Sequence, residues 1–240
     1  MKKTEILKIL IVPFAIYILL FFPTSTVIGA VIKNIHYKTS ILEFSIKNEL
    51  FRLSIYTIPS FLIIVFFYYR LCIFNNTDFG SLFLKRGKNG KILLSAFLKD
   101  CGFAAAVFSG LFVVCFSVNM AQEFFSGAAP VQIGYFGARP LSIFMLSLSC
   151  LGTGFLEEIF FRGFLPFSLK RVGAPLVLQF FLSGALFGLC HIWEGYYGVL
   201  SAFLSGIFLS FVFYKQKSLT TISLGHAAYN FVIWIAAALK

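Results

Sequence analysis

A series of apolar stretches, each long enough to cross a bilayer as a helix, constrains the fold of this chain more than any other feature. A membrane-spanning helix needs about 20 mainly apolar residues. The chain has such stretches at residues 6–32, 53–74, 101–119, 141–165, 174–192, 196–214 and 219–239. Hydrophobic residues make up 59% of the sequence and charged residues only 12%. We therefore predict an integral membrane protein, an all-α polytopic transmembrane helical bundle of about seven to eight spans.

The loops between these stretches carry most of the basic residues. Lys and Arg recur in alternate loops, which favours an inner N-terminus and an outer C-terminus, although the first loop breaks the alternation. The segment "NNTDFGSLFLKRGKNGKILLSAFLKD" is amphipathic and basic, and it predicts a helix on the membrane surface. We interpret the first stretch as a retained helix and not as a cleaved signal peptide, because its apolar run continues to Ile32.

The formal net charge of +11 raises the question of a nucleic-acid partner. The basic residues are scattered between helices and form no stripe with aromatic neighbours, so we predict no such partner. Each of the five cysteines lies in or beside an apolar run without a CxxC spacing, which favours packing over disulfides or a zinc site. A break in the apolar pattern at "SGAAPVQIGYFGARP" separates residues 1–139 from residues 140–240.

Three ionisable residues interrupt the fourth apolar stretch, in the segment "GFLEEIFFRGFL" from Gly154 to Leu165. Each such residue costs about 3 kcal/mol near the centre of a bilayer, so the cluster requires a reason. Glu158 and Arg162 are four residues apart, share a helical face and can form an ion pair. Glu157 points about 100° away. An unpaired, desolvated carboxylate is better suited than a paired one to take a proton from water.

Two later stretches carry polar residues at the same helical spacing. "FGLCH" places Phe187 and His191 four residues apart, and "HAAYN" does the same for His226 and Asn230. Hydrolysis inside a membrane needs a base, a group that holds water, and donors for the oxyanion of a tetrahedral intermediate. Glu157, the two histidines and the asparagine can supply all three.

These motifs, EExxxR, FxxxH and HxxxN in this order, resemble those of the CPBP family of intramembrane glutamic-type endopeptidases. This family is also called the CAAX prenyl protease and bacteriocin-processing, or Abi, family. The resemblance extends over about residues 140–238 and implies that Glu157 is the general base and that His191 holds and polarises the water. It also implies that His226 and Asn230 form the oxyanion hole.

The same resemblance gives supporting roles to the remaining motif residues. Glu158 would pair with Arg162 and brace the site, and Phe187 would form the wall beneath His191. Residues 140–240 would then be a CPBP-like catalytic helical core, preceded in residues 1–139 by N-terminal transmembrane helices and the basic amphipathic loop.

The function that we predict is hydrolysis of a peptide bond in a membrane-associated peptide or protein, lipid-modified or not, within a bacterial or archaeal cytoplasmic membrane. CAAX-type tails, leader peptides and sorting signals all fit, and membrane lipid is the other expected partner. The alternatives are a non-catalytic membrane scaffold or bacteriocin self-immunity protein on the same fold, and a proton-coupled transporter. We predict no cofactor; zinc is the alternative, which the lack of HExxH disfavours.

Overall fold

The computed structural model of the protein describes residues 3–22, 45–83, 94–127 and 139–238, and every regular element within these ranges is helical. In this described part of the chain, five helical segments are long and apolar enough to cross a membrane, and two shorter apolar helices accompany them. Each of these seven segments coincides with one of the predicted apolar stretches. The five are Ile46–Phe74, Leu94–Ser126, Pro140–Arg171, Gly195–Gln216 and Leu219–Ala236, and the shorter two are Ile9–Phe21 and Leu176–Leu189. The predicted helical membrane bundle is confirmed.

Two of the long spans contain a wider, π-helical turn. One span consists of α3 (Ile46–Arg52), the turn η2 (Leu53–Thr57) and α4 (Ile58–Phe74); the other consists of α6 (Pro140–Glu158), the turn η4 (Ile159–Phe164) and α7 (Leu165–Arg171). The remaining elements are α1 (Lys3–Ile16), η1 (Tyr17–Phe21), η3 (Gly80–Leu82), α5 (Leu94–Ser126), α8 (Leu176–Leu189), η5 (Ile192–Glu194), α9 (Gly195–Gln216) and α10 (Leu219–Ala238).

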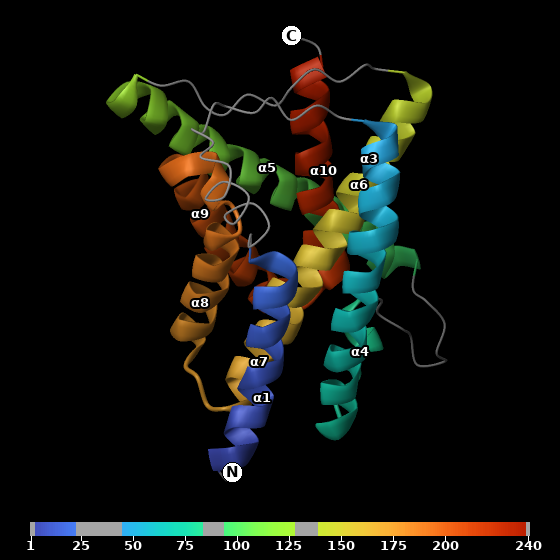
Figure 1. Ribbon diagram of the computed structural model, residues 1–240, viewed down its shortest axis with the longest axis vertical. Coiled ribbons are helices and arrows are strands. Elements are labelled where there is room, and N and C mark those ends of the chain that lie inside the picture. Colours follow the sequence, from blue (N-terminus) through green and yellow to red (C-terminus); the bar gives the residue numbers. More distant parts are fainter. Residues whose placement is uncertain (1–2, 23–44, 84–93, 128–138, 239–240) are drawn as a thin grey trace, which may run out of the picture.

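The span formed by α6, η4 and α7 runs through the middle of the molecule (Figure 1). On one side α10 packs between α6 and α5, α5 continues against α9, and α9 packs along α8. On the other side α3 and α4 contact the same span, and α1 lies against α7. The start of α1 and the end of α10 lie at opposite ends of the molecule.

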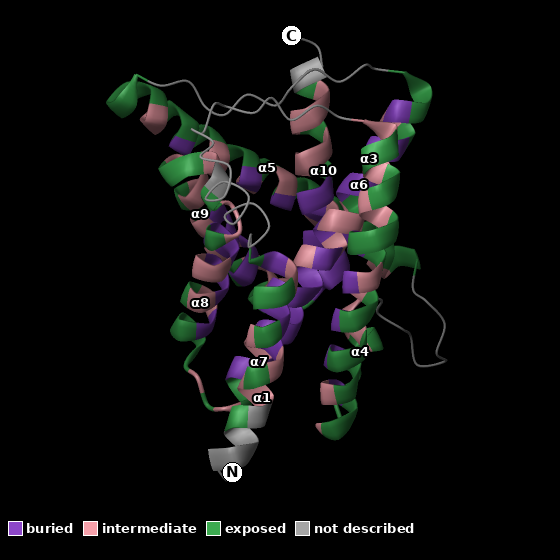
Figure 2. Ribbon diagram, viewed as in Figure 1, coloured by how far each residue is buried: buried purple, intermediate pink, exposed green. Residues whose placement is uncertain are grey.

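Burial identifies the same central span. In the most apolar part of Pro140–Arg171, 50% of the residues are buried inside the protein, compared with 17% in Ile46–Phe74. Most apolar side chains of Ile46–Phe74 therefore face outward, where lipid would surround them. Buried residues gather in the middle of the molecule and exposed ones on its outer helices (Figure 2). The aromatic core lies where η1 meets η4: the ring of Phe21 stacks on Phe160 with a centroid distance of 4.7 Å and packs edge-on against Phe161 at 4.9 Å.

Two glycines allow α10 to lie very close to its neighbours. A Cβ atom at Gly154 of α6 would come within 3.0 Å of the Ser223 carbonyl oxygen of α10. A Cβ atom at Gly225 of α10 would come within 2.7 Å of the Ala104 carbonyl oxygen of α5. Because both contacts are with backbone atoms, which cannot rotate away, the two glycines fix how deeply α10 is wedged between α6 and α5.

Several helix boundaries differ from those predicted. The second span begins at Ile46 and not at residue 53, and α5 begins at Leu94 and not at residue 101. A hydropathy window ends a span at its first charged residues, whereas these helices continue through them. Residues 94–100 of the predicted surface helix therefore belong to α5, and residues 46–52 of the first loop belong to α3, while residues 84–93 and 23–44 lie outside the described residues. The predicted orientation in the membrane stays a prediction.

We expect Gly225→Ala to destabilise the bundle, because the added methyl group would be forced against the α5 backbone. Overpacking of this kind costs about 1–3 kcal/mol, so the midpoint of thermal unfolding in detergent should fall by several degrees. Gly102→Ala is the matched control, since a Cβ atom at Gly102 of α5 meets nothing within 4 Å. Equal midpoints for the two variants would contradict this account of the α5 and α10 contact.

Candidate active site

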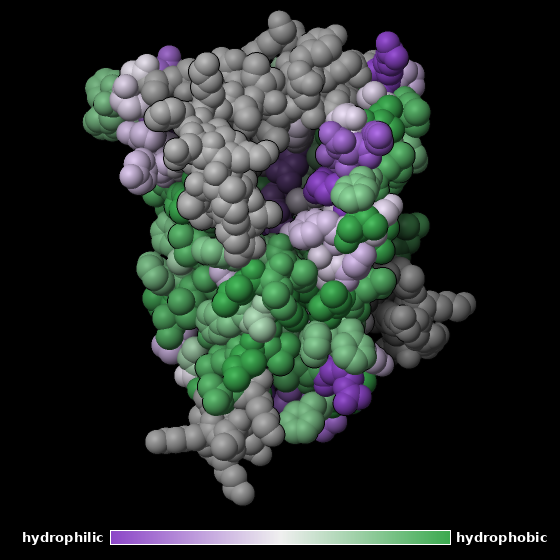
Figure 3. Space-filling view, in the orientation of Figure 1, coloured by the Kyte–Doolittle hydropathy of each residue, from purple (hydrophilic) through white to green (hydrophobic). Residues whose placement is uncertain are grey.

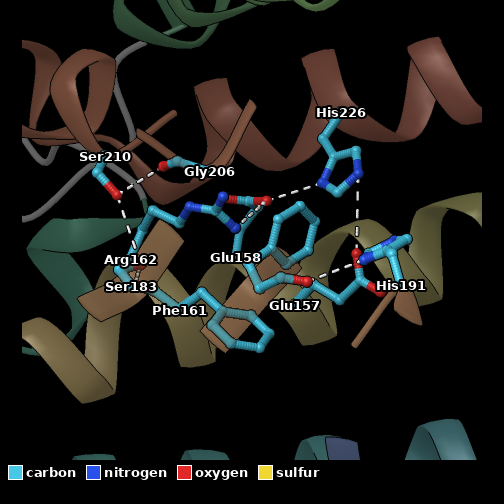
Figure 4. Close-up of polar contacts among 10 residues, drawn as sticks. Glu157, Glu158, Phe161, Arg162, Ser183, His191, Gly206, Ser210 and His226 are labelled. Carbon is cyan, nitrogen blue, oxygen red and sulfur yellow. Dashed lines mark hydrogen bonds and ion pairs between the residues drawn. The ribbon is translucent and has the colours of Figure 1, made fainter. Parts of the chain in front are cut away.

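The two adjacent carboxylates lie where α6 widens into the π-helical turn η4. Glu158 is the last residue of α6, and the turn begins at Ile159. Turns of this kind often mark functional sites. Here the neighbouring helix pairs one carbonyl group of the turn, because the Ser183 hydroxyl of α8 donates to the Phe161 carbonyl oxygen at 2.6 Å. The Ser210 hydroxyl of α9 donates to the Gly206 carbonyl at 2.8 Å and lies 3.4 Å from the Ser183 hydroxyl (Figure 4).

Glu158 is the centre of the polar cluster. Its Oε1 accepts a hydrogen bond from Arg162 Nη1 at 2.9 Å and another from His226 Nδ1 at 2.7 Å (Figure 4). The side chains of Glu158 and Arg162 are both fully buried. A single carboxylate oxygen therefore joins two points of the central span to α10. The predicted pair of Glu158 and Arg162 is present, whereas the contact of Glu158 with His226 did not follow from the motif spacing.

The bond to Glu158 determines which nitrogen of His226 carries a proton. An ionised carboxylate only accepts hydrogen bonds, so His226 Nδ1 must be the donor. The other ring nitrogen, Nε2, then lies 3.7 Å from Oε2 of Glu157. A neutral His226 offers Glu157 a lone pair, and only a protonated His226 offers it a hydrogen. The Glu157 side chain keeps 18% of its surface exposed, whereas Glu158 keeps none, so the two carboxylates occupy different environments.

The ring of Phe187 connects the two histidines and the arginine. The Arg162 guanidinium carbon lies 4.5 Å from the ring centroid, a cation–π contact. The rings of His191 and His226 pack edge-on against the same ring, with centroid distances of 4.9 and 5.9 Å. The buried Phe187 side chain therefore lies beneath both histidines and not only beneath His191, as the motif spacing predicts.

His191 lies just beyond the end of α8, in the connection to α9. This helix has only 14 residues and is about 21 Å long, shorter than the hydrocarbon core of a bilayer at about 30 Å. We therefore expect its end to lie within the depth of the membrane, and the contact of Phe187 with Arg162 brings this end close to the buried ion pair. His191 Nδ1 bonds to the Phe187 carbonyl oxygen at 2.9 Å, so Nδ1 is the donor and Nε2 keeps a free lone pair.

Asn230 is the most loosely placed of the expected site residues. It lies one turn beyond His226 on the same face of α10 and is partly buried. Within the described ranges no hydrogen bond of its side chain is present, in contrast to the histidine one turn earlier. The contacts thus unite Glu157, Glu158, Arg162 and His226, bring in His191 through Phe187, and leave Asn230 with a free amide.

Glu194 is an acidic residue near the site that no motif includes. It lies in η5, outside the membrane-spanning helices, and its backbone N–H donates to the His191 carbonyl oxygen at 2.9 Å. Burial raises the pKa of Glu194, His191 lowers this pKa again in part, and Glu157 raises it. One sequence feature indicates that Glu194 lies near the site: only two residues separate it from His191.

The described side chains form no assembled zinc site, and the absence of a cofactor stays a prediction. A zinc ion needs at least three protein ligands whose donor atoms converge on one point. Among the described residues no group of three or more His, Cys, Asp and Glu side chains is arranged in this way. Nδ1 of His226 is bonded to Glu158 and Nδ1 of His191 to the Phe187 carbonyl, so each ring keeps only Nε2 as a possible ligand atom. We therefore derive no step through a metal.

The helical bundle and the order of the three motifs are those that the resemblance to the CPBP family implies. The comparison with known families agrees: residues 139–232 match the family described as "Type II CAAX prenyl endopeptidase Rce1-like". The chain thus carries an Rce1-like domain, and the three motifs lie inside it. The family is in general a family of peptidases. No curated protein and no solved structure matches the chain.

We expect Arg162→Met to destabilise the protein strongly. The variant keeps the apolar length of the side chain but leaves the buried Glu158 carboxylate with His226 as its remaining partner. Loss of one partner of a buried ion pair costs about 3–5 kcal/mol. The double variant Glu158→Gln with Arg162→Met, measured by thermal unfolding in detergent, should lose less than the single variant. Arg171→Met, at an exposed position at the end of α7, is the matched control.

Glu194 should make stability depend on pH. Because its pKa is raised in the folded protein, the folded state keeps a proton that the unfolded chain has lost. The free energy of unfolding should therefore fall as the pH rises from the ordinary value of 4.5 through the raised pKa. Glu194→Gln should flatten this part of the pH profile of unfolding midpoints. Glu123→Gln, at an exposed position near the end of α5, should leave the profile as in the wild type.

Proposed function

We propose that the protein is an intramembrane endopeptidase that hydrolyses a peptide bond of a membrane-associated substrate. One observation carries this proposal: two adjacent carboxylates at membrane depth differ in pairing and exposure. Glu158 is fully buried and accepts two charge-assisted hydrogen bonds, whereas Glu157 is partly exposed and lies 3.7 Å from His226. A structural ion pair accounts for the first carboxylate but gives no reason for the second.

Glu157 is the general base in this proposal, and His191 holds the water. Among the described residues Glu157 has no cationic partner as close as the one that Glu158 has in Arg162, so its lone pairs remain available for a proton. His191 Nε2 has a free lone pair, because Nδ1 is bonded to the Phe187 carbonyl. Two acceptors of this kind can hold the two hydrogens of one water molecule and leave its oxygen free to attack.

His226 and Asn230 form the oxyanion hole. Since Nδ1 of His226 is bonded to Glu158, the ring can donate from Nε2 only when it is protonated. The carboxylates of Glu158 and Glu157 on either side of the ring stabilise this charged form. The free amide of Asn230, one turn away, supplies the second donor.

The proposed reaction has two steps, the attack of water and the collapse of the tetrahedral intermediate. The water oxygen attacks the carbonyl carbon of the scissile bond while Glu157 takes one proton, and the carbonyl oxygen becomes an oxyanion facing His226 and Asn230. The intermediate collapses as the carbon–nitrogen bond breaks, and the leaving amine receives the proton from Glu157. Glu158 and Arg162 touch no reacting atom and act by positioning His226 and the turn η4.

The substrate class that we propose is a peptide or protein at the membrane, with a CAAX-type tail, a leader peptide or a sorting signal as the cleaved segment. The match of residues 139–232 to an Rce1-like family of CAAX prenyl endopeptidases supports the first of these. A non-catalytic scaffold on the same fold would keep its partners after loss of the Glu157 carboxylate. A peptidase would lose its activity, so a variant without this carboxylate distinguishes the two functions.

We expect Glu157→Gln to abolish cleavage while the protein stays folded in the membrane. Loss of a base that activates the nucleophile should lower the rate at least 10²–10⁴-fold. One measurement is the cleavage of peptides from a fluorogenic library by the purified full-length protein. A second compares the membrane proteomes of cells that contain the wild type or the Glu157→Gln variant. Glu123→Gln makes the same chemical change at an exposed position and should cleave like wild type. Undiminished cleavage by Glu157→Gln would overturn the proposal.

A further inference from the structure

Two polar stripes face each other above the carboxylates. One face of the helix from α3 into η2 and one face of α6 carry polar residues at helical spacings, and these elements pack together. The stripe on α3 and η2 consists of Glu49, Arg52 and Tyr56, and the stripe on α6 consists of Ser149, Thr153 and finally Glu157. We call the first five of these residues the α3–α6 polar face. It leads along α6 directly to the proposed general base.

Hydrogen bonds join the two stripes. Arg52 Nη1 donates to the Thr153 hydroxyl at 3.0 Å, and Arg52 Nε and Nη2 donate to Glu49 Oε2 at 2.9 and 2.8 Å. Arg52 Nη2 also donates to the Ser149 hydroxyl, which in turn donates to Glu49. Four of the five N–H groups of Arg52 are thus used, and one on Nη1 remains.

The α3–α6 polar face is accessible from outside the protein. The Arg52 side chain keeps 37% of its surface exposed and Glu49 keeps 19%. Figure 3 shows a hollow in the molecular surface beside α3, with hydrophilic residues at its bottom and along the α3 side. Polar side chains that only join two helices in a membrane would be expected to be buried between apolar residues. The exposure of Arg52 and Glu49 therefore indicates a further role.

We propose that the α3–α6 polar face binds the substrate as an extended, uncharged peptide segment, with Arg52 and Thr153 bonding to its main chain. The inference rests on the proposed peptidase function, because that function makes a peptide the ligand. Arg52 and Glu49 together carry no net charge, so this pair favours the binding of neither an anionic nor a cationic group. The remaining N–H of Arg52, the Thr153 hydroxyl hydrogen and the free oxygen of Glu49 provide both donors and an acceptor.

The length of the face sets how much of the substrate it can hold. At a helical rise of about 1.5 Å per residue, Thr153 lies about 6 Å and Ser149 about 12 Å from Glu157 along α6. An extended chain advances about 3.3 Å per residue, so about four residues on one side of the scissile bond fit this distance. A helical segment would not bind here, because its main-chain groups are already hydrogen-bonded within the helix.

The first test compares the kinetics of Thr153→Val and Thr220→Val with a library peptide that the wild type cleaves. Valine has the shape of threonine without the hydroxyl. Thr153→Val should raise KM about three- to tenfold with kcat within twofold of wild type, because substrate binding and not the chemical step is affected. Thr220, whose hydroxyl donates to the Phe83 carbonyl away from this face, is the control and should leave both constants unchanged. An unchanged KM for Thr153→Val would overturn the inference.

The second test needs no cleavage and so separates this inference from the proposed function. Thr153→Cys in the Glu157→Gln background is labelled with a water-soluble maleimide, and labelling at position 153 is read by peptide mass spectrometry. A capped, uncharged hexapeptide rich in valine and serine should slow the labelling severalfold, and its N-methylated form should not. Protection without any cleavage by the wild type would overturn only the peptidase proposal. Equal labelling in all conditions, or protection only by a peptide with a free carboxylate, would overturn the peptide-binding face.

Discussion

The fully buried carboxylate of Glu158 is the interaction on which the rest of the site depends. A lone ionised group at this depth would be strongly unfavourable, and Arg162 and His226 compensate it from two helices. Since one oxygen accepts both hydrogen bonds, the position of α10 is coupled to the position of the turn η4. The same contact sets the protonated nitrogen of His226 and leaves the other nitrogen facing Glu157. Oε1 of Glu158 therefore both holds α10 against the central span and sets the protonation of the His226 ring.

The surrounding fold keeps this arrangement rigid with small residues and irregular helical turns. Gly154 and Gly225 bring α10 into backbone contact with α6 and α5, so the histidine enters the site at a fixed depth. The π-helical turn η4 packs against the π-helical turn η1 through stacked aromatic rings. Irregular backbone is stable at this depth because neighbouring side chains such as Ser183 pair its carbonyl groups.

The sequence predicted the helical membrane bundle, its seven apolar segments and the family resemblance, because these depend on local composition and short spacings. The pair of Glu158 and Arg162 was predictable for the same reason, since both residues lie on one helix. The bond from His226 to Glu158 was not, because it joins residues 68 positions apart. The predicted second stretch begins only at residue 53, because charge ends a hydropathy window, whereas Arg52 lies within α3 and bonds to residues of α3 and α6. The catalytic roles of Glu157, His191, His226 and Asn230 stay predictions.

The shortness of α8 has a consequence for the lipid around the protein. At about 21 Å, this helix falls about 9 Å short of the usual hydrocarbon thickness. The mismatch is relieved by local thinning of the bilayer or by headgroups and water moving inward at that flank, at a modest cost per ångström. We therefore expect the bilayer beside α8 to be thinner or wetter than beside the longer helices, so that the length of the acyl chains affects the region around His191.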